Sequence, residues 1–270
     1  GAPVFAGPAT PIPQDRLPEE LPGMAWDLLP MDKYRAHNWH CFDNIRARQP
    51  YASLYTSLGC PFQCAFCCIN APFGHRGFRF WPPEQTIRVF DILAEKYGVR
   101  NIKIADEMFV LREAHFLRLC ELLIEHNHGF NIWAYARVDT VKPAHLERLK
   151  KAGINWLALG IESGSRHVRD GAAKGRFGER DIVDIVARIK DAGIHVIGNY
   201  IFGLPDDTMD SMRATLDMAL ALNCEMANFY CAMAYPGSKL YDMALAKNWR
   251  LPDSWLGYSQ HAFETLPLPT

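Results

Sequence analysis

Three cysteines in one short run are the residues of this chain with the clearest capacity for chemistry. Cys60, Cys64 and Cys67 follow a C-x3-C-x2-C spacing. Three thiolates on one loop can hold three corners of an iron–sulfur cube, whereas a fully protein-ligated 4Fe–4S cluster takes four cysteines. The remaining iron would then be open, as in catalytic rather than structural metal sites. The spacing therefore predicts chemistry at the metal.

A zinc site is the alternative interpretation of the same run. Structural zinc takes four ligands, commonly from two separated pairs. The sequence has no second C-x2-C pair and no H-x3–5-H. Cys68 and His75 could complete such a site, although the adjacent Cys67–Cys68 pair is awkward geometry. The isolated cysteines are more simply buried apolar residues: Cys41, Cys120, Cys224 and Cys231.

The run resembles the signature of the radical S-adenosylmethionine (radical SAM) enzymes. Phe66 matches the aromatic position of the family's C-x3-C-x-aromatic-C form, and the resemblance implies that it packs near the adenine. It also implies that Cys60, Cys64 and Cys67 bind a 4Fe–4S cluster whose open iron chelates S-adenosylmethionine. The reduced cluster would cleave this cofactor to a 5′-deoxyadenosyl radical. An electron donor such as flavodoxin or ferredoxin would then be a partner.

Composition limits the class of protein. The chain has 270 residues, enough for one large α/β domain or two small ones, and 49% of them are hydrophobic. The formal net charge of −1 gives no sign of nucleic-acid or membrane-surface binding. No run approaches the roughly 18 apolar residues of a membrane span, and no signal peptide is visible. Eight cysteines without disulfide-like spacing suit a reducing interior. We therefore expect a cytoplasmic protein.

The amino-terminal part differs from the rest. Seven of the eighteen prolines lie in the first 30 residues, which predicts an extended connector rather than a core element. We expect a linker over 1–50, a barrel over 51–248, and a truncated extension over 249–270. The segment 21–34 resembles the linker before the radical SAM core in enzymes that carry an amino-terminal cobalamin-binding domain. No such domain is present in this chain.

From residue 51 onward, short β-branched or aromatic runs alternate with longer amphipathic stretches, which indicates βα units around a parallel sheet. Strands are expected over 52–56, 101–105, 131–136, 156–161, 195–202 and 227–234. Helices are expected over 83–97, 113–126, 143–152, 180–192, 208–222 and 238–247. Six units fit the open (βα)6 partial TIM barrel, an α/β fold, that the family resemblance implies. An open sheet or a full eight-unit barrel fits the pattern as well.

Polar residues follow the expected strands, at the edge where α/β barrels collect their chemistry. Asp106 and Glu107 stand where the family often has Gly-Gly-Glu, and either carboxylate could accept from the ammonium of S-adenosylmethionine; Asp106 is slightly favoured. Arg137 offers a bidentate fork for the cofactor carboxylate. An ion pair with Asp139 or Glu162 is the alternative for this arginine.

The later strand ends resemble further motifs of the family. Glu162 and Ser163 lie in Gly-Ile-Glu-Ser-Gly, which resembles the strand-four motif, and Glu162 would accept from the ribose hydroxyls or the ammonium. Asn199 and Gly203 lie in a segment that resembles the adenine side of the site. There Asn199 would contact the ribose or carboxylate, and Gly203 would let a flat ring approach the backbone.

Tyr235 and Pro236, in Tyr-Pro-Gly-Ser, resemble the family's Pro-Gly-Thr segment, where backbone groups read the adenine edge. The resemblance thus implies a radical SAM enzyme core that abstracts hydrogen from a small-molecule or peptide substrate. With a cobalamin domain outside this chain, methyl transfer or a radical rearrangement is the expected outcome. The alternative from another class is a non-catalytic iron–sulfur or zinc module for electron transfer or scaffolding.

Overall fold

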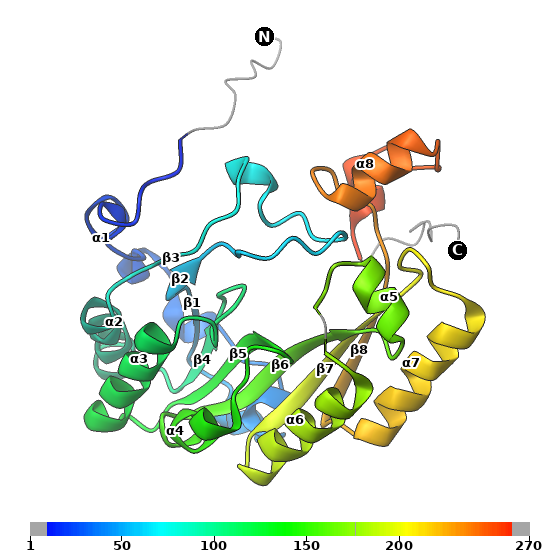
Figure 1. Ribbon diagram of the computed structural model, residues 1–270. Coiled ribbons are helices and arrows are strands. Elements are labelled where there is room, and N and C mark those ends of the chain that lie inside the picture. Colours follow the sequence, from blue (N-terminus) through cyan, green and yellow to red (C-terminus); the bar gives the residue numbers. More distant parts are fainter. Residues whose placement is uncertain (1–9, 176, 261–270) are drawn as a thin grey trace.

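Six parallel strands form the main sheet of this protein (Figure 1). The structure is a computed structural model and describes residues 10–175 and 177–260. Their order along the sheet is β1-β4-β5-β6-β7-β8, so each strand pairs with the next parallel strand in the chain. The six are β1 (Tyr51–Leu54), β4 (Asn101–Ile104), β5 (Asn131–Arg137), β6 (Ile154–Glu162), β7 (His195–Phe202) and β8 (Met226–Cys231). All six expected strands are confirmed, with bounds that shift by up to three residues.

Helices between the strands cover the outer face of the curved sheet (Figure 1). They are α2 (Pro83–Glu95), α3 (Glu113–His126), α4 (Leu146–Lys151), α6 (Glu179–Asp191) and α7 (Met209–Leu222). Helix α8 (Lys239–Ala246) follows the last strand and lies above the sheet in Figure 1, where Leu240 and Ala244 pack in a second hydrophobic cluster. The local chemistry explains their ends. Pro83 occupies the first turn of α2, and the side chain of Thr208 caps α7 by accepting from the Ser211 N–H at 3.2 Å.

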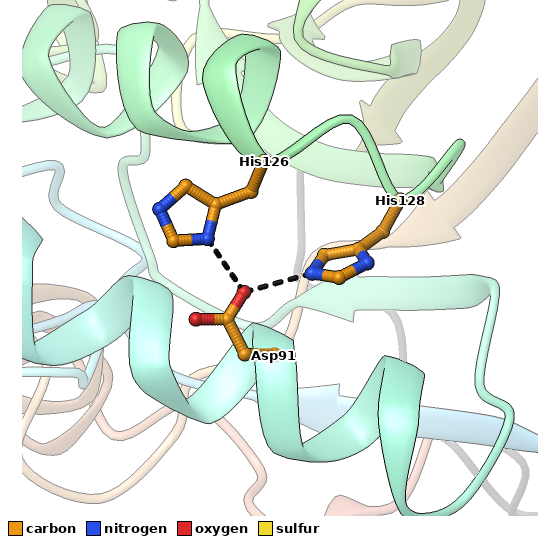
Figure 2. A group of neighbouring side chains, drawn as sticks. All are labelled: Asp91, His126 and His128. Carbon is orange, nitrogen blue, oxygen red and sulfur yellow. Dashed lines mark hydrogen bonds and ion pairs between the residues drawn. The ribbon is translucent and has the colours of Figure 1, made fainter.

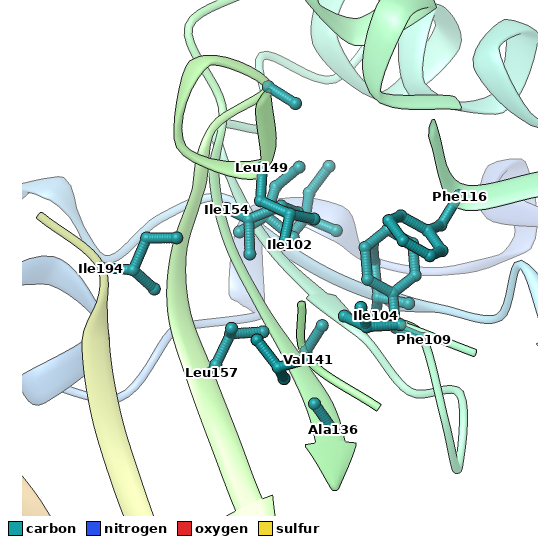
Figure 3. Packing of buried hydrophobic residues seen from close by; sticks show 14 of the residues in the cluster. Ile102, Ile104, Phe109, Phe116, Ala136, Val141, Leu149, Ile154, Leu157 and Ile194 are labelled. Atoms are coloured by element: carbon teal, nitrogen blue, oxygen red, sulfur yellow. The ribbon is translucent and has the colours of Figure 1, made fainter. Parts of the chain in front are cut away.

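The main hydrophobic core lies between the sheet and these helices. Ile102 and Ile104 on β4 and Leu157 on β6 are fully buried and pack in one cluster with Phe109 and Phe116 (Figure 3). Side chains alternate along a strand, so the residues between them face the inside of the barrel. This alternation decides which residues reach the site.

The amino-terminal segment is not the extended connector that its prolines predict. Within residues 10–50 the chain forms the short helix α1 (Leu17–Glu20) and four 3₁₀ turns. Trp26 and Met31 are buried in the main core. The ring of Trp39 packs edge-on against Trp133 at 5.5 Å and Trp156 at 5.1 Å.

The prediction was wrong because proline content alone does not show what lies between the prolines. The apolar residues there, such as Trp26 and Met31, pack in the core and anchor the turns. Trp133 and Trp156 lie near the amino ends of β5 and β6, so Trp39 packs at the end of the barrel opposite the strand carboxyl ends. Prolines at 3 and 8 lie outside the described residues.

Three smaller elements were not predicted. The two-residue strands β2 (Ser57–Leu58) and β3 (Arg79–Phe80) pair antiparallel on either side of the cysteine run. Helix α5 (Arg166–Gly171) follows β6. Towards the carboxyl terminus a 3₁₀ turn spans Trp255–Tyr258, and the rest of the expected extension, 261–270, lies outside the described residues. No helix in the described ranges is long and apolar enough to span a membrane.

Candidate functional site

The cysteine loop lies across the carboxyl ends of the strands because several contacts fix its backbone. Gly59 has a φ of +84°, and a Cβ there would meet the carbonyl oxygen of Gly77 at 2.6 Å, so glycine is required. Further along, the Ala65 N–H donates to the Ala172 carbonyl at 2.9 Å, and its own carbonyl accepts from the Leu240 N–H at 2.9 Å. The loop is therefore tied to the chain after α5 and to the start of α8.

One cavity of about 450 Å³ joins this loop to the strand ends. Its volume lies within the roughly 300–1,000 Å³ of small-molecule sites. Eight of the residues predicted from the sequence line it: Cys60, Cys64, Cys67, Phe66, Glu107, Arg137, Glu162 and Asn199. Residues up to 139 positions apart in the chain thus meet in one space.

Burial disfavours the thiolate form of Cys60 and Cys67. Desolvation raises the pKa of Cys60, and it raises that of Cys67 to about 11, with the neighbouring sulfurs adding to the shift. A metal cluster binds thiolates and displaces these protons. Binding of a metal by these thiols would therefore release protons.

Asp106 and Glu107 face opposite sides of the sheet. Asp106 is fully buried and accepts hydrogen bonds at 2.6 Å from the Thr56 N–H, the Thr56 hydroxyl and the Ser57 hydroxyl. Burial raises its pKa to about 6, against the opposing effect of these hydrogen bonds. Glu107 lines the cavity and accepts from the Gly59 N–H at 3.1 Å. The two carboxylates therefore have different surroundings, and only Glu107 faces the site.

Arg137 is engaged by the protein itself. Its guanidinium forms a bidentate pair with Asp139 at 2.8 Å, donates to Cys64 Sγ at 3.3 Å, and donates to the carbonyl oxygen of Lys174. It also lies 3.8 Å from the centre of the Phe62 ring. The ion pair with Asp139, the alternative weighed for this arginine, is therefore present, and Nη1 is the nitrogen that reaches the sulfur of Cys64.

Glu162 pairs with a lysine that sequence reasoning missed. Lys174 Nζ lies 2.6 Å from Glu162 Oε1, and both side chains are buried. Glu162 has a φ of +67°, and the β6–β7 register shifts between Gly160 and Glu162, which is how bulges re-aim side chains near active sites. A Cβ at Gly160 would lie 2.5 Å from Lys174 Nζ. Lys174 follows α5 in an irregular stretch with no pattern that marks it.

The other predicted residues do not line the cavity. Ser163 is buried behind β6, where its hydroxyl lies 3.2 Å from that of Thr215. The Gly203 N–H donates to Asp207 Oδ2 at 2.9 Å. The Tyr235 hydroxyl accepts from the side-chain amide of Gln260 at 2.6 Å, and Pro236 follows in the same turn.

Aromatic residues and a lysine on the inner face of the barrel were also missed. Tyr135 and Tyr230 line the cavity. Below them, Lys103 Nζ lies 4.5 Å from the Trp133 ring centre and 5.2 Å from that of Tyr135. Desolvation lowers the pKa of Lys103. Strand alternation would have placed all four inside the barrel.

Comparison with known proteins identifies the family. The sequence profile of the Radical SAM superfamily matches residues 54–219, which is more than half of the chain and includes the cysteine run. The chain belongs to the radical SAM superfamily. An uncharacterized methyltransferase of Pyrococcus horikoshii is 32% identical over 241 residues, covering 89% of this chain and 50% of that protein.

A second relative is the anaerobic magnesium-protoporphyrin IX monomethyl ester cyclase of Rubrivivax gelatinosus, 28% identical over 240 residues, or 88% of this chain and 41% of that protein. This radical SAM chain thus spans half or less of these curated relatives. Among solved structures, TsrM is a radical S-adenosylmethionine methyltransferase from Kitasatospora setae, solved with cobalamin and a [4Fe-4S] cluster bound. It superposes with a TM-score of 0.68 at 18% identity, covering 77% of this chain and 39% of that one. The partial-barrel fold is thereby confirmed.

The residues present fit the cofactors that the radical SAM family implies. Three thiols on one loop suit three irons and leave one iron open. The cavity beside them offers two carboxylates, Glu107 and Glu162, and the amide of Asn199. This donor set suits a ligand that carries an ammonium and hydroxyl groups.

Proposed function

We propose that this chain is the catalytic core of a radical SAM enzyme that uses S-adenosylmethionine and a 4Fe–4S cluster. The observation that carries the proposal is the shared cavity: all three cysteines of the run line it together with polar side chains from four strand ends. When bound and reduced, the cluster supplies the electron that splits the cofactor into methionine and a 5′-deoxyadenosyl radical. The protein binds, orients and shields these groups.

Within this proposal, each side chain of the chain has a specific task. Cys60, Cys64 and Cys67 hold the three irons. Arg137 donates a hydrogen bond to the sulfur of Cys64 and stabilises its thiolate. Arg137 is therefore a positioning residue and not a ligand of the cluster. Phe66 packs beside the adenine.

The polar groups across the cavity bind the cofactor itself. Glu107 accepts from its ammonium; this role moves from Asp106, whose oxygens are occupied by Thr56 and Ser57. Glu162 is held by Lys174 and accepts hydrogen bonds from the ribose hydroxyls. The side-chain amide of Asn199 also contacts the ribose.

The cofactors can be tested directly. Anaerobic reconstitution with iron and sulfide should load about four irons per chain, and S-adenosylmethionine should perturb the electron paramagnetic resonance signal of the reduced cluster. Cys64→Ser should lose both, whereas Cys68→Ser should keep both, since Cys68 does not line the cavity. A fully loaded cluster that ignores S-adenosylmethionine would favour the non-catalytic electron-transfer module.

Methyl transfer assisted by cobalamin is the reaction we propose for the whole protein. The Pyrococcus relative is named a methyltransferase, and the fold neighbour was solved with cobalamin bound. The cavity wall of Tyr135 and Tyr230 suits a small-molecule or peptide substrate with an apolar face. The reductant would be a flavodoxin or ferredoxin. Addition of methylcobalamin, S-adenosylmethionine with a labelled methyl group and candidate substrates to the full-length protein tests this reaction.

A further inference from the structure

A second cluster of potential metal ligands lies outside the cofactor cavity. Asp91 is on α2, His126 is the last residue of α3, and His128 lies in the turn before β5 (Figure 2). His126 Nδ1 and His128 Nε2 each lie 2.8 Å from the same oxygen, Oδ1 of Asp91. The three ligand atoms lie within 4.8 Å of one another. None of these residues lines the cavity of the cysteine loop.

The backbone holds the three side chains in this arrangement. Asn127, which follows the last residue of α3, is in the left-handed conformation with φ 48°, and Gly129 has φ 67°. The chain therefore turns sharply and brings His128 back beside His126. The ring of Phe130 then packs against Phe90 at 5.4 Å and against His128 at 5.5 Å. Because Phe90 precedes Asp91 on α2 and is fully buried, both sides of the cluster are anchored in the core.

The hydrogen bonds of the cluster depend on the position of two protons. One carboxylate oxygen faces two imidazole nitrogens, and this requires an N–H on Nδ1 of His126 and on Nε2 of His128. A divalent cation at the same point takes a lone pair from each imidazole and keeps the carboxylate as a ligand. Each neutral ring then carries its proton on the other nitrogen, Nε2 of His126 and Nδ1 of His128. Neutral imidazole and carboxylate are the ligands that zinc takes in proteins, at about 2.0–2.2 Å.

We propose that Asp91, His126 and His128 form a binding site for a divalent transition-metal ion of the Zn²⁺ class. The side chains are 23%, 36% and 16% exposed, respectively, so a hydrated ion can reach them from solvent. Three protein ligands leave room for water on the ion. The ion would join α2 to the end of α3 and the turn into β5, and so brace one side of the barrel.

This site is independent of the proposed radical chemistry, and the experiment must keep the two metals apart. The probe is Zn²⁺, titrated calorimetrically into the anaerobic, cluster-loaded chain so that the three cysteines are already occupied. A parallel titration of the Cys60→Ser, Cys64→Ser, Cys67→Ser triple variant removes the thiols altogether. Each should bind one zinc ion per chain, and the triple variant should do so even if the cysteines prove not to hold a cluster.

Single substitutions assign the ligands. His126→Gln and His128→Gln should each weaken zinc affinity at least about tenfold, since even the loss of groups that only support a metal ligand costs about 10–100-fold. His167→Gln, on the exposed surface of α5, should bind zinc like the wild type. Zinc should raise the melting temperature of the wild type and of His167→Gln, because it binds the folded state, but not that of the two ligand variants.

Melting curves without metal show whether each variant is folded. Wild-type affinity in both His126→Gln and His128→Gln would overturn the proposal, and so would the absence of one-to-one binding at micromolar zinc in the triple cysteine variant. Asp91, His126 and His128 would then form a hydrogen-bonded triad only. If a ligand variant unfolds, anomalous scattering at the zinc edge from a zinc-soaked wild-type crystal tests the site instead. The proposal requires an anomalous peak between the three side chains, and its absence would overturn the proposal.

Discussion

Asp106 and Glu107 are adjacent in the sequence but face opposite sides of the sheet. Asp106 continues the buried outer row of Ile102 and Ile104, whereas Glu107 continues the inner row of Lys103 and Ala105. The three donors around Asp106 belong to Thr56 and Ser57, which follow β1 and lead into β2. Its carboxylate therefore fixes the start of the cysteine loop, and Glu107 is left for the ligand.

Substitution of these two carboxylates should separate stability from binding. Asp106→Ala leaves three buried donors without an acceptor and should lower the free energy of unfolding by about 2–4 kcal/mol, measured by urea denaturation. Glu107→Gln should leave that free energy within about 0.5 kcal/mol of wild type and weaken S-adenosylmethionine at least about tenfold in equilibrium dialysis. Equal loss of cofactor affinity with no loss of stability in Asp106→Ala would contradict the assignment.

The pair of Glu162 and Lys174 is buried in the cavity wall. Lys174→Met leaves an uncompensated carboxylate and should cost about 3–5 kcal/mol of stability. Glu162→Gln, which keeps the shape of the side chain, should cost less and should mainly weaken cofactor binding. Chemical denaturation and equilibrium dialysis check the two effects. A Lys174→Met variant as stable as wild type would show that the pair is not held as the structure has it.

At the scale of elements, the alternation of strands and helices was predictable because each βα unit carries its own hydrophobic period. The cysteine loop was predictable because its three cysteines are close in sequence. The sequence did not show which of Asp106 and Glu107 faces the cavity. The two carboxylates are adjacent just after β4, and only their position in the alternation of side chains distinguishes them. Lys174 could not be predicted because its partner Glu162 is reached through the irregular turn after α5, which no periodic pattern describes.

The aromatic packing of the amino-terminal segment should contribute to the stability of the barrel. Trp39→Ala removes the ring that packs against Trp133 and Trp156 and should cost about 2–4 kcal/mol, less than a fully buried tryptophan because Trp39 is only partly buried. Trp255→Ala is the matched control, since Trp255 is 79% exposed and should change stability by about 0.5 kcal/mol or less. Thermal unfolding compares them; equal effects would mean that residues 10–50 are not part of the folded unit.

At the scale of the molecule, two buried histidines link folding to pH. Burial lowers the pKa of His40 and of His115 to about 4, and each ring contacts a backbone carbonyl, that of Asn131 and Trp81 respectively. In the unfolded chain both titrate near 6.5. Between pH 6.5 and 4 the unfolded state therefore binds more protons, and stability falls as pH falls through this window.

Each histidine should contribute roughly 3 kcal/mol to that loss. Asp106 acts in the opposite direction, because its raised pKa lets the folded state keep a proton between about pH 6 and 4. The net loss is therefore smaller than the two histidine contributions together. Urea denaturation from pH 7 to 4 should show a shallower decline for His40→Gln, whose amide can still donate to the Asn131 carbonyl. An unchanged pH profile in this variant would mean that His40 is not buried as a neutral ring.

In the proposed function, S-adenosylmethionine is reductively cleaved in the cavity between the cysteine loop and the strand ends. The most direct measurement is release of 5′-deoxyadenosine, scored by mass spectrometry after anaerobic reconstitution and addition of dithionite and S-adenosylmethionine. The account predicts release by the wild type and by Cys231→Ala, whose cysteine is exposed and lies outside the cavity, and background release by Cys64→Ala. Equal release by Cys64→Ala and wild type, or a wild type that loads about four irons and S-adenosylmethionine yet releases none, would contradict it.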